Sequence, residues 1–380
     1  MQHVYAYKQC QRSNLEIAYQ HIHEAYEPDL NSMEVQDREQ LAHDRQIAIQ
    51  LLDLYFERKP LEDAAEKHLN TVKEAIRLYE KQCRKDQEFL LNQMISTTER
   101  VADHYRLFLL LLIELAEESH RDQQKKMSLS QTTNPSAAHT NFYLNQAIQA
   151  LRDSHVLRQQ AEEHKLNWNN YRVEIRQWYK NQVKPDSSFQ QYQVLDKTSL
   201  EDDIQIVRHI FNQLVLKSDP IATVFEEIDI NWQENSKAIK SMVNRTLKSI
   251  DKEDDDYDEI DIVDLTPNWE DDRKFLIDLY QITLQNDLEY EEMIRDKAEN
   301  WTVDRIASLD SIVIKMAIAE MIHFSSIPIK VTINEYIDLS KNYSTQKSKQ
   351  FVNGMLDVIS QELQSKNLIR KSGRGLIDNQ

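Results

Sequence analysis

The sequence predicts an all-α protein. Its 380 residues contain only 3 Gly and 7 Pro, far fewer than the roughly 7% Gly and 5% Pro of average chains. Hairpins and phosphate-binding loops need Gly for positive φ and close backbone approach, so sandwiches, Rossmann domains and P-loop enzymes are nearly excluded. The hydrophobic fraction of 40% allows two or three domains with at least one sizeable core.

The chain is strongly acidic, with 46 Lys and Arg against 64 Asp and Glu and a net charge of −18. Two cysteines, Cys10 and Cys83, are too few for a disulfide framework or a Cys-based zinc site, which suits a reducing cytoplasm. The first residues lack the layout of a signal peptide. The longest apolar run, residues 107–113, is far shorter than the roughly 20 residues of a membrane span. We therefore expect a cytoplasmic protein without a membrane segment.

Residues 37–115 carry apolar side chains every three or four positions with charges between them, which is the pattern of an amphipathic helix. Pro60 interrupts this run and, as a first-turn proline, can open a second helix over residues 61–83. A third helix follows through Leu111. Its Leu-rich end is apolar on every side, which favours burial in a bundle over a membrane or partner groove.

Residues 119–140 are polar and small, so we expect a linker or long loop there. Helical patterning resumes at Tyr143, and aromatic side chains recur at helix spacing between Trp168 and Tyr179. Core packing is favoured for these aromatics over a platform for stacking bases. Pro185 marks another connection.

The second half of the chain contains a weak internal repeat. An EDD triplet at residues 201–203 precedes Trp232 at the same spacing with which a triplet at residues 270–272 precedes Trp301. Both copies predict a helix, a break and another helix, although helical periodicity alone produces much of the agreement. The aligned apolar pairs are Val207 with Leu276, Ile210 with Leu279, Phe211 with Tyr280, and Phe225 with Ile294.

No motif indicates an enzyme or a metal centre. Residues 251–261 contain eight acidic side chains and one Lys but no Gly for the sixth position of a calcium loop, so we expect a solvated, flexible acidic loop. The twelve histidines form no HExxH pair, and no nucleophile elbow, Cys-x-x-Cys pair or kinase motif set occurs. We expect no metal, no cofactor and no catalytic residue, with an enzyme built from scattered carboxylates as the minor alternative.

The C-terminal end has the opposite charge to the rest of the chain. Residues 301–380 carry ten Lys or Arg and eight Asp or Glu, so this segment is +2 and the remaining 300 residues are −20. A polyanionic partner is credible only at this basic end. The alternative is a solvated tail with ordinary lysines.

Three motifs lie in this basic segment: LDxxxxKxAxxE from Leu309, IPxKVTINE from Ile327, and FVNGxLD from Phe351. Together they resemble the C-terminal half of NusB, the bacterial transcription antitermination family. Residues 272–300 resemble the preceding family helix, and residues 1–26 resemble its first helix, with a QxxYAY stretch in place. The resemblance implies a bundle of two three-helix subdomains, interrupted here by a large helical insertion.

The resemblance divides the chain into five parts. They are residues 1–26, the first helix of the NusB-like domain; 27–198, a helical insertion; 199–268, a helical segment with the acidic loop and a possible repeat unit; 269–365, the NusB-like C-terminal core; and 366–380, a basic flexible tail.

The family binds the boxA element of ribosomal RNA leaders together with ribosomal protein NusE, and the pair helps RNA polymerase to ignore terminators. The resemblance therefore implies a non-enzymatic transcription regulator whose partners are single-stranded boxA-like RNA, NusE and the RNA polymerase antitermination complex. Family members usually begin with an arginine-rich stretch that is not seen here, so either RNA binding is weaker or the true start lies upstream. A helical protein scaffold with reduced RNA binding is the alternative. A ribosomal RNA cytosine methyltransferase with a NusB-like domain is excluded, because no Gly-rich cofactor region or catalytic cysteine motif follows.

The resemblance also selects the residues expected at the binding surface. RNA contacts are expected at Gln2, Tyr5, Lys315, Lys347, Lys349, Gln350 and Phe351. Asp310 is expected in the first turn of its helix, near the protein partner. The residues themselves leave plainer alternatives open, namely solvated lysines, a half-buried Tyr, a core Phe and a carboxylate that stabilises a helix start.

Two further features of this segment predict local structure. Thr332 and Glu335 have the spacing of a capping box, with Pro328 just ahead of it. Gly354 lies inside a helix, where Gly costs about 1 kcal/mol relative to Ala, so we expect it to permit the close approach of a neighbour rather than a backbone contact with RNA.

Overall fold

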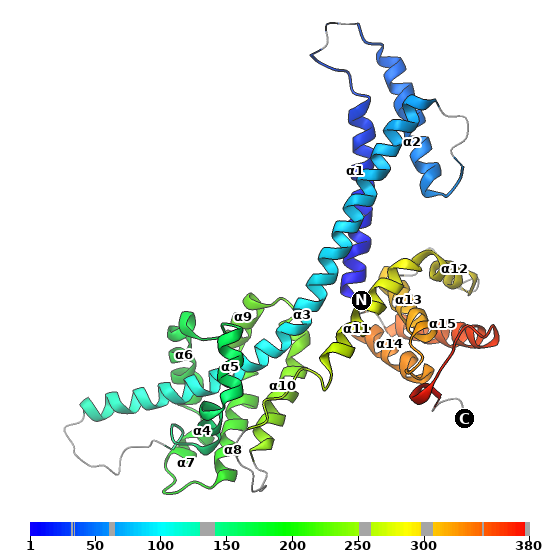
Figure 1. Ribbon diagram of the computed structural model, residues 1–380. Helices are drawn as coiled ribbons and strands as arrows, with labels where there is room; N and C mark the ends of the chain where they lie inside the picture. The colour runs from blue at the N-terminus through cyan, green and yellow to red at the C-terminus, as the bar shows by residue number, and fades with distance from the viewer. Residues whose placement is uncertain are drawn as a thin grey trace. The chain divides into compact units, whose positions relative to one another are not determined.

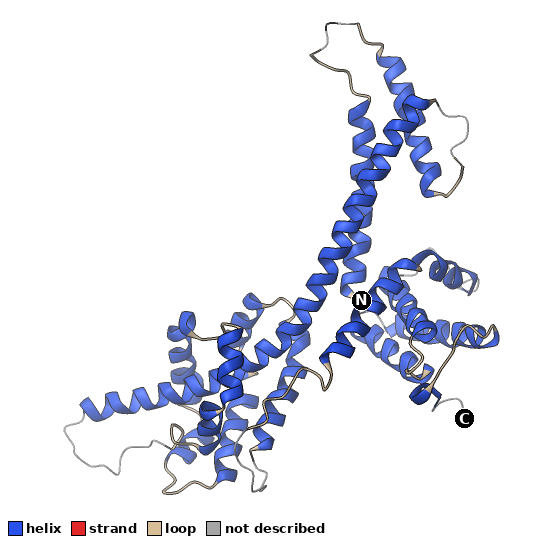
Figure 2. Cartoon of the chain, viewed as in Figure 1, coloured by secondary structure: helices blue, strands red, loops and turns tan. Residues whose placement is uncertain are grey.

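The computed structural model describes residues 1–31, 33, 35–60, 65–129, 141–250, 260–297, 307–343 and 346–376. Every regular element in this described part is helical (Figure 2), which confirms the all-α prediction. No helix within the same residues has the length and apolar character needed to cross a membrane. The chain divides into two compact units (Figure 1). Unit 1 contains Met1–Ile95 and Glu270–Gln380, and unit 2 contains Ser96–Trp269.

One end of unit 1 is formed by α1 (Gln2–Ala25), α2 (Arg38–Phe56) and the first part of α3 (Glu66–Leu129). Asp37 caps α2, because its side chain accepts hydrogen bonds from two backbone amides of the first turn. The three helices share a small core of buried side chains. Its members are Ala18, Ile22, Tyr26, Ala48, Leu51, Leu52, Val72 and Ala75.

Helix α3 corrects two predictions. It continues for 64 residues from Glu66 to Leu129, so a separate helix ending at residue 83 is wrong, and so is a linker that begins at residue 119. The physical reason is that no Gly or Pro occurs between its ends. The rest of that predicted linker, residues 130–140, lies outside the described residues, as do residues 61–64.

The larger core of unit 1 is built around α13 (Ser308–His323), whose side chains are buried on nearly every side. The other helices that contribute to this core are α11 (Trp269–Gln285), α12 (Asp287–Lys297), α14 (Ile329–Tyr343) and α15 (Gln346–Ser365). Val4 from α1 belongs to the same cluster. The start of the chain and its C-terminal helices therefore fold as one unit, as the family resemblance implies.

Two local predictions in this core are wrong. Helix α14 begins at Ile329, directly after Pro328, so Thr332 lies inside the helix and is fully buried. Its hydroxyl donates a hydrogen bond to Glu320 Oε1 at 2.8 Å instead of capping a helix end. Gly354 does not permit a close approach of any described residue, because a Cβ added there would meet none of their heavy atoms within 4 Å.

The C-terminal segment is docked onto the turn between α13 and α14. Lys371 Nζ donates to the Phe324 carbonyl at 2.9 Å, and the Ser372 amide donates to the Ser325 carbonyl at 2.9 Å. A Cβ on Gly375 would lie 2.1 Å from that Ser325 oxygen, so the approach requires Gly. The prediction of a flexible tail is therefore wrong as far as residue 376, and residues 377–380 lie outside the described residues.

Unit 2 wraps short helices around the second part of α3. They are α4 (Gln146–Asp153), α5 (His155–Glu163), α6 (Arg172–Trp178), α7 (Ser187–Gln193), α8 (Leu200–His209), α9 (Asp219–Ile228) and α10 (Trp232–Ser249), with the short segments η2 (Asn169–Tyr171), η3 (Tyr179–Val183) and η4 (Ile210–Val215). Residues 251–259 of the acidic run lie outside the described residues.

The core of unit 2 is aromatic. Phe108 of α3 lies at its centre, with its ring centroid 4.1 Å from that of Phe225 and 5.3 Å from that of Trp232. Trp168 is buried and donates its indole N–H to the Leu107 carbonyl at 2.9 Å. Tyr179 is also buried, so the core interpretation of these aromatics is confirmed, as is burial of the Leu-rich end of the helix.

Candidate nucleic-acid interface

The first turns of α1 present a polar face at the surface of unit 1. Tyr5, Lys8 and Arg12 are three and four residues apart, a spacing that places side chains on the same side of a helix. Tyr5 is 36% exposed, and Arg12 is also exposed. With side chains from α12 and α13, including Asp287 and Lys315, this face lines a cavity of about 700 Å³.

An ionic network forms one wall of this cavity. Asp287, the first residue of α12, accepts hydrogen bonds from Lys8 and from Lys315, whose Nζ lies 2.9 Å from Asp287 Oδ1. Glu291 forms a second ion pair with Lys315 and accepts a hydrogen bond from Ser311 at 3.4 Å. The Lys315 side chain is only 6% exposed, so its charge is balanced inside the fold.

The protonation of Asp287 follows from two opposing effects. Burial raises the pKa of this carboxyl group, whereas the hydrogen bonds from Lys8 and Lys315 lower it. The combined effect of the two lysines is larger than that of burial, so the pKa of Asp287 lies below its ordinary value. Asp287 is therefore ionised at neutral pH, and it keeps both lysines oriented toward the cavity wall.

The cavity can recognise a polar ligand of low charge density. Its two lysines and two carboxylates neutralise one another, which leaves Arg12 as its uncompensated cation among the described side chains. Gln9 and Gln285 line the same cavity with amides that can donate and accept hydrogen bonds, and Tyr5 supplies a partly exposed ring. This combination suits contacts to base edges and to a single phosphate.

A second polar group lies at the start of α15. Lys349 and Gln350 are exposed, whereas Phe351 is only 8% exposed and packs in the same core cluster as Val4 of α1. The side chain of Lys347 lies outside the described residues. The exposed side chains of this helix start and the N-terminal residues of α1 are thus anchored on one core.

The predicted residues lie in the lining of a cavity, at the surface or in the interior, and Lys315 belongs both to the cavity lining and to the buried residues. Tyr5 and Lys315 line one cavity, and Gln2, Lys349 and Gln350 lie at the surface. Lys315 and Phe351 are buried, which favours an internal ion pair and a core side chain at these positions. Contact with RNA stays a prediction for each of these residues.

Asp310 lies in the first turn of α13, as predicted. It is only 4% exposed, and its Oδ1 atom is buried without a hydrogen-bond partner among the residues that the structure describes. Its position favours stabilisation of the helix start, where a carboxylate interacts with the positive end of the helix dipole. Contact with a protein partner stays a prediction.

Sequence reasoning missed Lys8, Arg12, Asp287 and Glu291. A signal for them exists, because Lys8 and Arg12 are four residues apart on one predicted helix, and Asp287 and Glu291 have the same spacing on another. Like charges at this spacing repel each other unless a partner of opposite charge lies nearby. One of these pairs is positive and the other is negative, which is a reason to expect that the two pairs form a shared ionic network.

No group of three or more His, Cys, Asp or Glu side chains that could hold a metal ion occurs among the residues whose placement is described. Cys10 and Cys83 are both free thiols.

Residues 221–361 match the family model described as the NusB family. The chain is 42% identical over 106 residues to the transcription antitermination protein NusB of Chloroherpeton thalassium, a match that covers 28% of this chain and 50% of that protein. Identity to the protein of the same name from Salinibacter ruber is 40% over 105 residues, covering 28% of this chain and 66% of that one. For Natranaerobius thermophilus it is 38% over 73 residues, covering 19% and 52%.

The chain thus matches between half and about two thirds of the length of these relatives. No solved structure matches it significantly. The family match extends from α9 to α15 and includes the helix that carries Lys315 and the one that carries Lys349 and Gln350. The C-terminal region of this chain is therefore a NusB-family domain, carried in a chain that is longer than a typical NusB.

Proposed function

We propose that the protein acts in transcription antitermination, with unit 1 binding boxA-type single-stranded RNA of ribosomal RNA leaders together with NusE. The observation that carries the proposal is the match of residues 221–361 to the NusB family model. The similar proteins from Chloroherpeton thalassium and Salinibacter ruber are named as transcription antitermination proteins. On this proposal the protein catalyses no reaction. It works in the cytoplasm as a component of the RNA polymerase antitermination complex.

The geometry of unit 1 supports this proposal. Arg12, Lys349, Gln350 and Tyr5 provide exposed cations, an amide and a ring on helices anchored in one core, which are the groups that single-stranded RNA needs for phosphate contacts, base edges and stacking. The chain carries a net charge of −18, of which unit 1 has half with 26 Lys and Arg against 35 Asp and Glu, so both units repel polyanions outside the local basic groups. Few phosphate contacts are available, so RNA binding by the protein alone should be weak.

A titration of boxA RNA with and without NusE tests the proposal. We expect NusE to tighten binding markedly, because its own surface adds the contacts that this acidic chain lacks. Equal affinities in the two arms would contradict the proposal. The double variant Arg12→Gln/Lys349→Gln should lower the slope of log K against log salt by roughly 0.7 for each RNA phosphate that is no longer neutralised.

A matched control is available in unit 2. Arg172 and Lys237 are an exposed Arg and an exposed Lys outside the candidate interface, and the double variant Arg172→Gln/Lys237→Gln changes the net charge by the same amount. We expect this control to leave the salt slope unchanged. Equal slopes for the two double variants would remove Arg12 and Lys349 from the RNA site.

A helical scaffold with reduced RNA binding is the second candidate. Its support is the acidity of the chain as a whole, because unit 1 (26 Lys and Arg against 35 Asp and Glu) and unit 2 (20 against 29) are both acidic, and an acidic surface suits a protein partner better than RNA. The same titration separates the two functions. A folded protein that binds no boxA RNA even with NusE would favour the scaffold.

A further inference from the structure

The cavity of about 700 Å³ in unit 1 extends beyond its ionic network along α1. Tyr5, Arg12 and Leu15 all line it, and the rise of an α-helix separates Tyr5 from Leu15 by about 15 Å along the axis. Helix α2 lies beside the later part of α1, where the Tyr19 hydroxyl donates a hydrogen bond to Asp53. The cavity therefore has one end at Tyr5 and a second end where α1 meets α2.

This second end is aromatic. Its walls include Phe56, the last residue of α2, and Tyr79 of α3, and both side chains are partly open to solvent. The two rings meet edge to face with their centroids 4.9 Å apart, and the Tyr79 hydroxyl is hydrogen-bonded to the Cys83 thiol. The rings are thus held in place by the fold, and such rings are surfaces on which unpaired bases stack.

Arg12 supplies a cation beside these rings. It is exposed, and among the described side chains it is the cation of the cavity without a carboxylate partner. Arg12 lies three residues before Leu15 and therefore on the same face of α1. A nucleotide joins an anionic phosphate to a flat base, so an unpaired arginine beside aromatic rings matches both of its parts.

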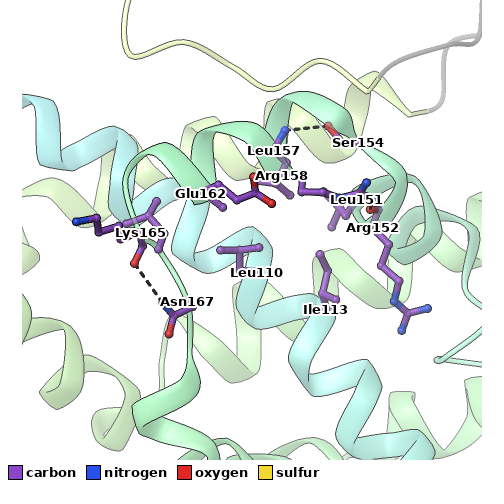
Figure 3. A pocket seen from close by; sticks show the side chains of 12 residues that line it. Leu110, Ile113, Leu151, Arg152, Ser154, Leu157, Arg158, Glu162, Lys165 and Asn167 are labelled. Carbon is purple, nitrogen blue, oxygen red and sulfur yellow. Dashed lines mark hydrogen bonds between the residues drawn. The ribbon is translucent and has the colours of Figure 1, made fainter.

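The cavity of unit 2 lacks these features. It has a volume of about 520 Å³ and lies between α3, α4 and α5 (Figure 3), where Leu110, Ile113 and Leu151 give it an apolar interior. None of the described residues that line it is aromatic, so it offers no surface on which a base could stack. Arg152 at its rim already donates to the Tyr143 carbonyl at 2.9 Å. The combination of rings and an unpaired cation therefore distinguishes the cavity of unit 1 from that of unit 2.

We propose that the aromatic end of the unit 1 cavity binds one unpaired base of the RNA, stacked against the Phe56–Tyr79 pair, with the adjoining phosphate on Arg12. Phe56 and Tyr79 belong to residues 27–198, the insertion expected from the family resemblance, and lie outside the family match at residues 221–361. The insertion thus adds a base contact of its own. This inference rests on the proposed function, because it concerns a further contact to the same single-stranded RNA.

Binding of the full chain to boxA RNA with flanking nucleotides on both sides, in the presence of NusE, tests this contact. Phe56→Leu keeps an apolar side chain but removes the ring. It should lower RNA affinity by about fivefold or more, because stacking on the ring is lost, and it should leave the slope of log K against log salt unchanged. Phe56→Tyr retains a ring and should bind RNA as the wild type does.

Phe89→Leu is the matched control. Phe89 is a ring of unit 1 that is 61% exposed and lies outside this cavity, so its replacement should not change RNA affinity. An equal loss of affinity in Phe56→Leu and Phe89→Leu would overturn the inference, because the effect would then not come from the cavity.

Three further results separate the inference from the proposed function. Wild-type affinity in Phe56→Leu, with RNA bound by the wild type and NusE, would overturn the base contact and leave the proposed function intact. Weaker binding of NusE to Phe56→Leu in the absence of RNA would assign the aromatic end to the protein partner and would also overturn the inference. A wild type that binds no RNA even with NusE would contradict the proposed function, and the base contact with it.

Photo-crosslinking of the wild type gives a readout that does not depend on the folding of a variant. The same RNA, carrying 5-iodouridine at successive positions, should at one of them form a crosslink to the peptide that contains Phe56 or to the one that contains Tyr79. Crosslinks confined to other peptides would overturn the inference.

Discussion

The predicted internal repeat aligns residues of unit 2 with residues of unit 1, and some of the aligned positions differ in polarity. Three of the four aligned apolar pairs are buried in both units, whereas Val207 is buried and its counterpart Leu276 is only half-buried. The buried pairs are Ile210 with Leu279, Phe211 with Tyr280, and Phe225 with Ile294. The same alignment pairs Thr246 with Lys315 and Ser218 with Asp287. Unit 2 therefore places hydroxyl groups where unit 1 has an ion pair.

The buried side chains of Thr246 and Lys315 are satisfied by different interactions. Thr246 is bonded to the Tyr105 hydroxyl and donates to the Asp261 carbonyl at 3.0 Å. The charged Lys315 side chain instead lines a cavity and forms ion pairs with Asp287 and Glu291. The charged copy belongs to the unit that carries the candidate RNA surface, and the uncharged copy belongs to the unit with an aromatic core and an apolar pocket.

The largest effect is expected from removing a core ring in each unit. Phe351→Ala and Phe108→Ala should each lower the free energy of unfolding of their own unit by about 3–4 kcal/mol, because both rings are buried. Hydrogen exchange of α15 and of α10 reports the two units separately. RNA binding with NusE should survive Phe108→Ala. Loss of RNA affinity by about 1–3 kcal/mol in Phe351→Ala, without a change in exchange, would mean that Phe351 stacks on a base.

The sequence predicts the helical class well because few Gly and Pro residues interrupt its periodicity. Helices α1, α13 and α15 follow from local pattern and from the family motifs, and Asp310 lies in the helix turn where it is expected. Long-range partners are harder to predict. Lys315 is bonded to Asp287, 28 residues away, and Lys8 reaches the same carboxylate across 279 residues.

Pattern reasoning also fails where two local rules compete. Thr332 and Glu335 have the spacing of a capping box, but Pro328 allows α14 to begin at once, so Thr332 becomes a buried donor to Glu320. Gly354 has the sequence position of a packing glycine, yet no heavy atom in the described part of the chain lies within 4 Å of a Cβ added there. The pocket beside Arg152 has no sequence signal, because residues from three helices create it.

Replacing the aligned polar residues Lys315 and Thr246 by apolar ones tests the comparison between the two units. Lys315→Met should destabilise unit 1 by about 3 kcal/mol, because Asp287 and Glu291 lose a buried partner. Thr246→Val should destabilise unit 2 by about 1–2 kcal/mol, since one neutral hydrogen-bonding group is removed. Urea unfolding followed by hydrogen exchange in α13 and α10 measures both changes.

A double variant controls for the ion pair itself. Asp287→Leu/Lys315→Met replaces both partners by apolar side chains and should lose less stability than Lys315→Met alone. An additive loss in the double variant would mean that the two residues contribute separately, and the contrast between a charged and an uncharged repeat copy would then carry no energetic meaning.

Moderate acid should separate the two units. Burial lowers the pKa of His104 in unit 2, and this outweighs the nearby Asp229 carboxylate, which raises it. The unfolded chain binds a proton below about pH 6.5 that the folded unit excludes, so stability falls as pH decreases, by up to about 1.4 kcal/mol per pH unit, until the lowered pKa is reached. Asp287 in unit 1 has a lowered pKa. Its contribution to stability is present above its unfolded pKa near 4 and is lost only at lower pH.

Unfolding measured at pH 7 and pH 5 tests this difference. The wild type should lose stability in unit 2 over this interval, and His104→Gln should reduce the loss, because the variant has no group at this position that titrates. An equal pH dependence in both proteins would exclude His104 as the origin. Asp103 and Arg100 also influence this ring, so the single substitution at position 104 is the appropriate control.

The smallest expected effect concerns Gly354 in α15, and it tests whether the helix surface beside the candidate interface is free. Gly354→Ala should stabilise unit 1 by about 1 kcal/mol, because Ala favours a helix over Gly and the added methyl group meets no heavy atom within 4 Å. Gly375→Ala is the opposite control, since its methyl group would lie 2.1 Å from the Ser325 carbonyl oxygen and should destabilise the docked C-terminal segment. Binding of boxA RNA with NusE should be unchanged in Gly354→Ala. A stabilised protein that binds RNA less tightly would instead show that the RNA or NusE approaches the backbone at Gly354, where a methyl group would hold it away.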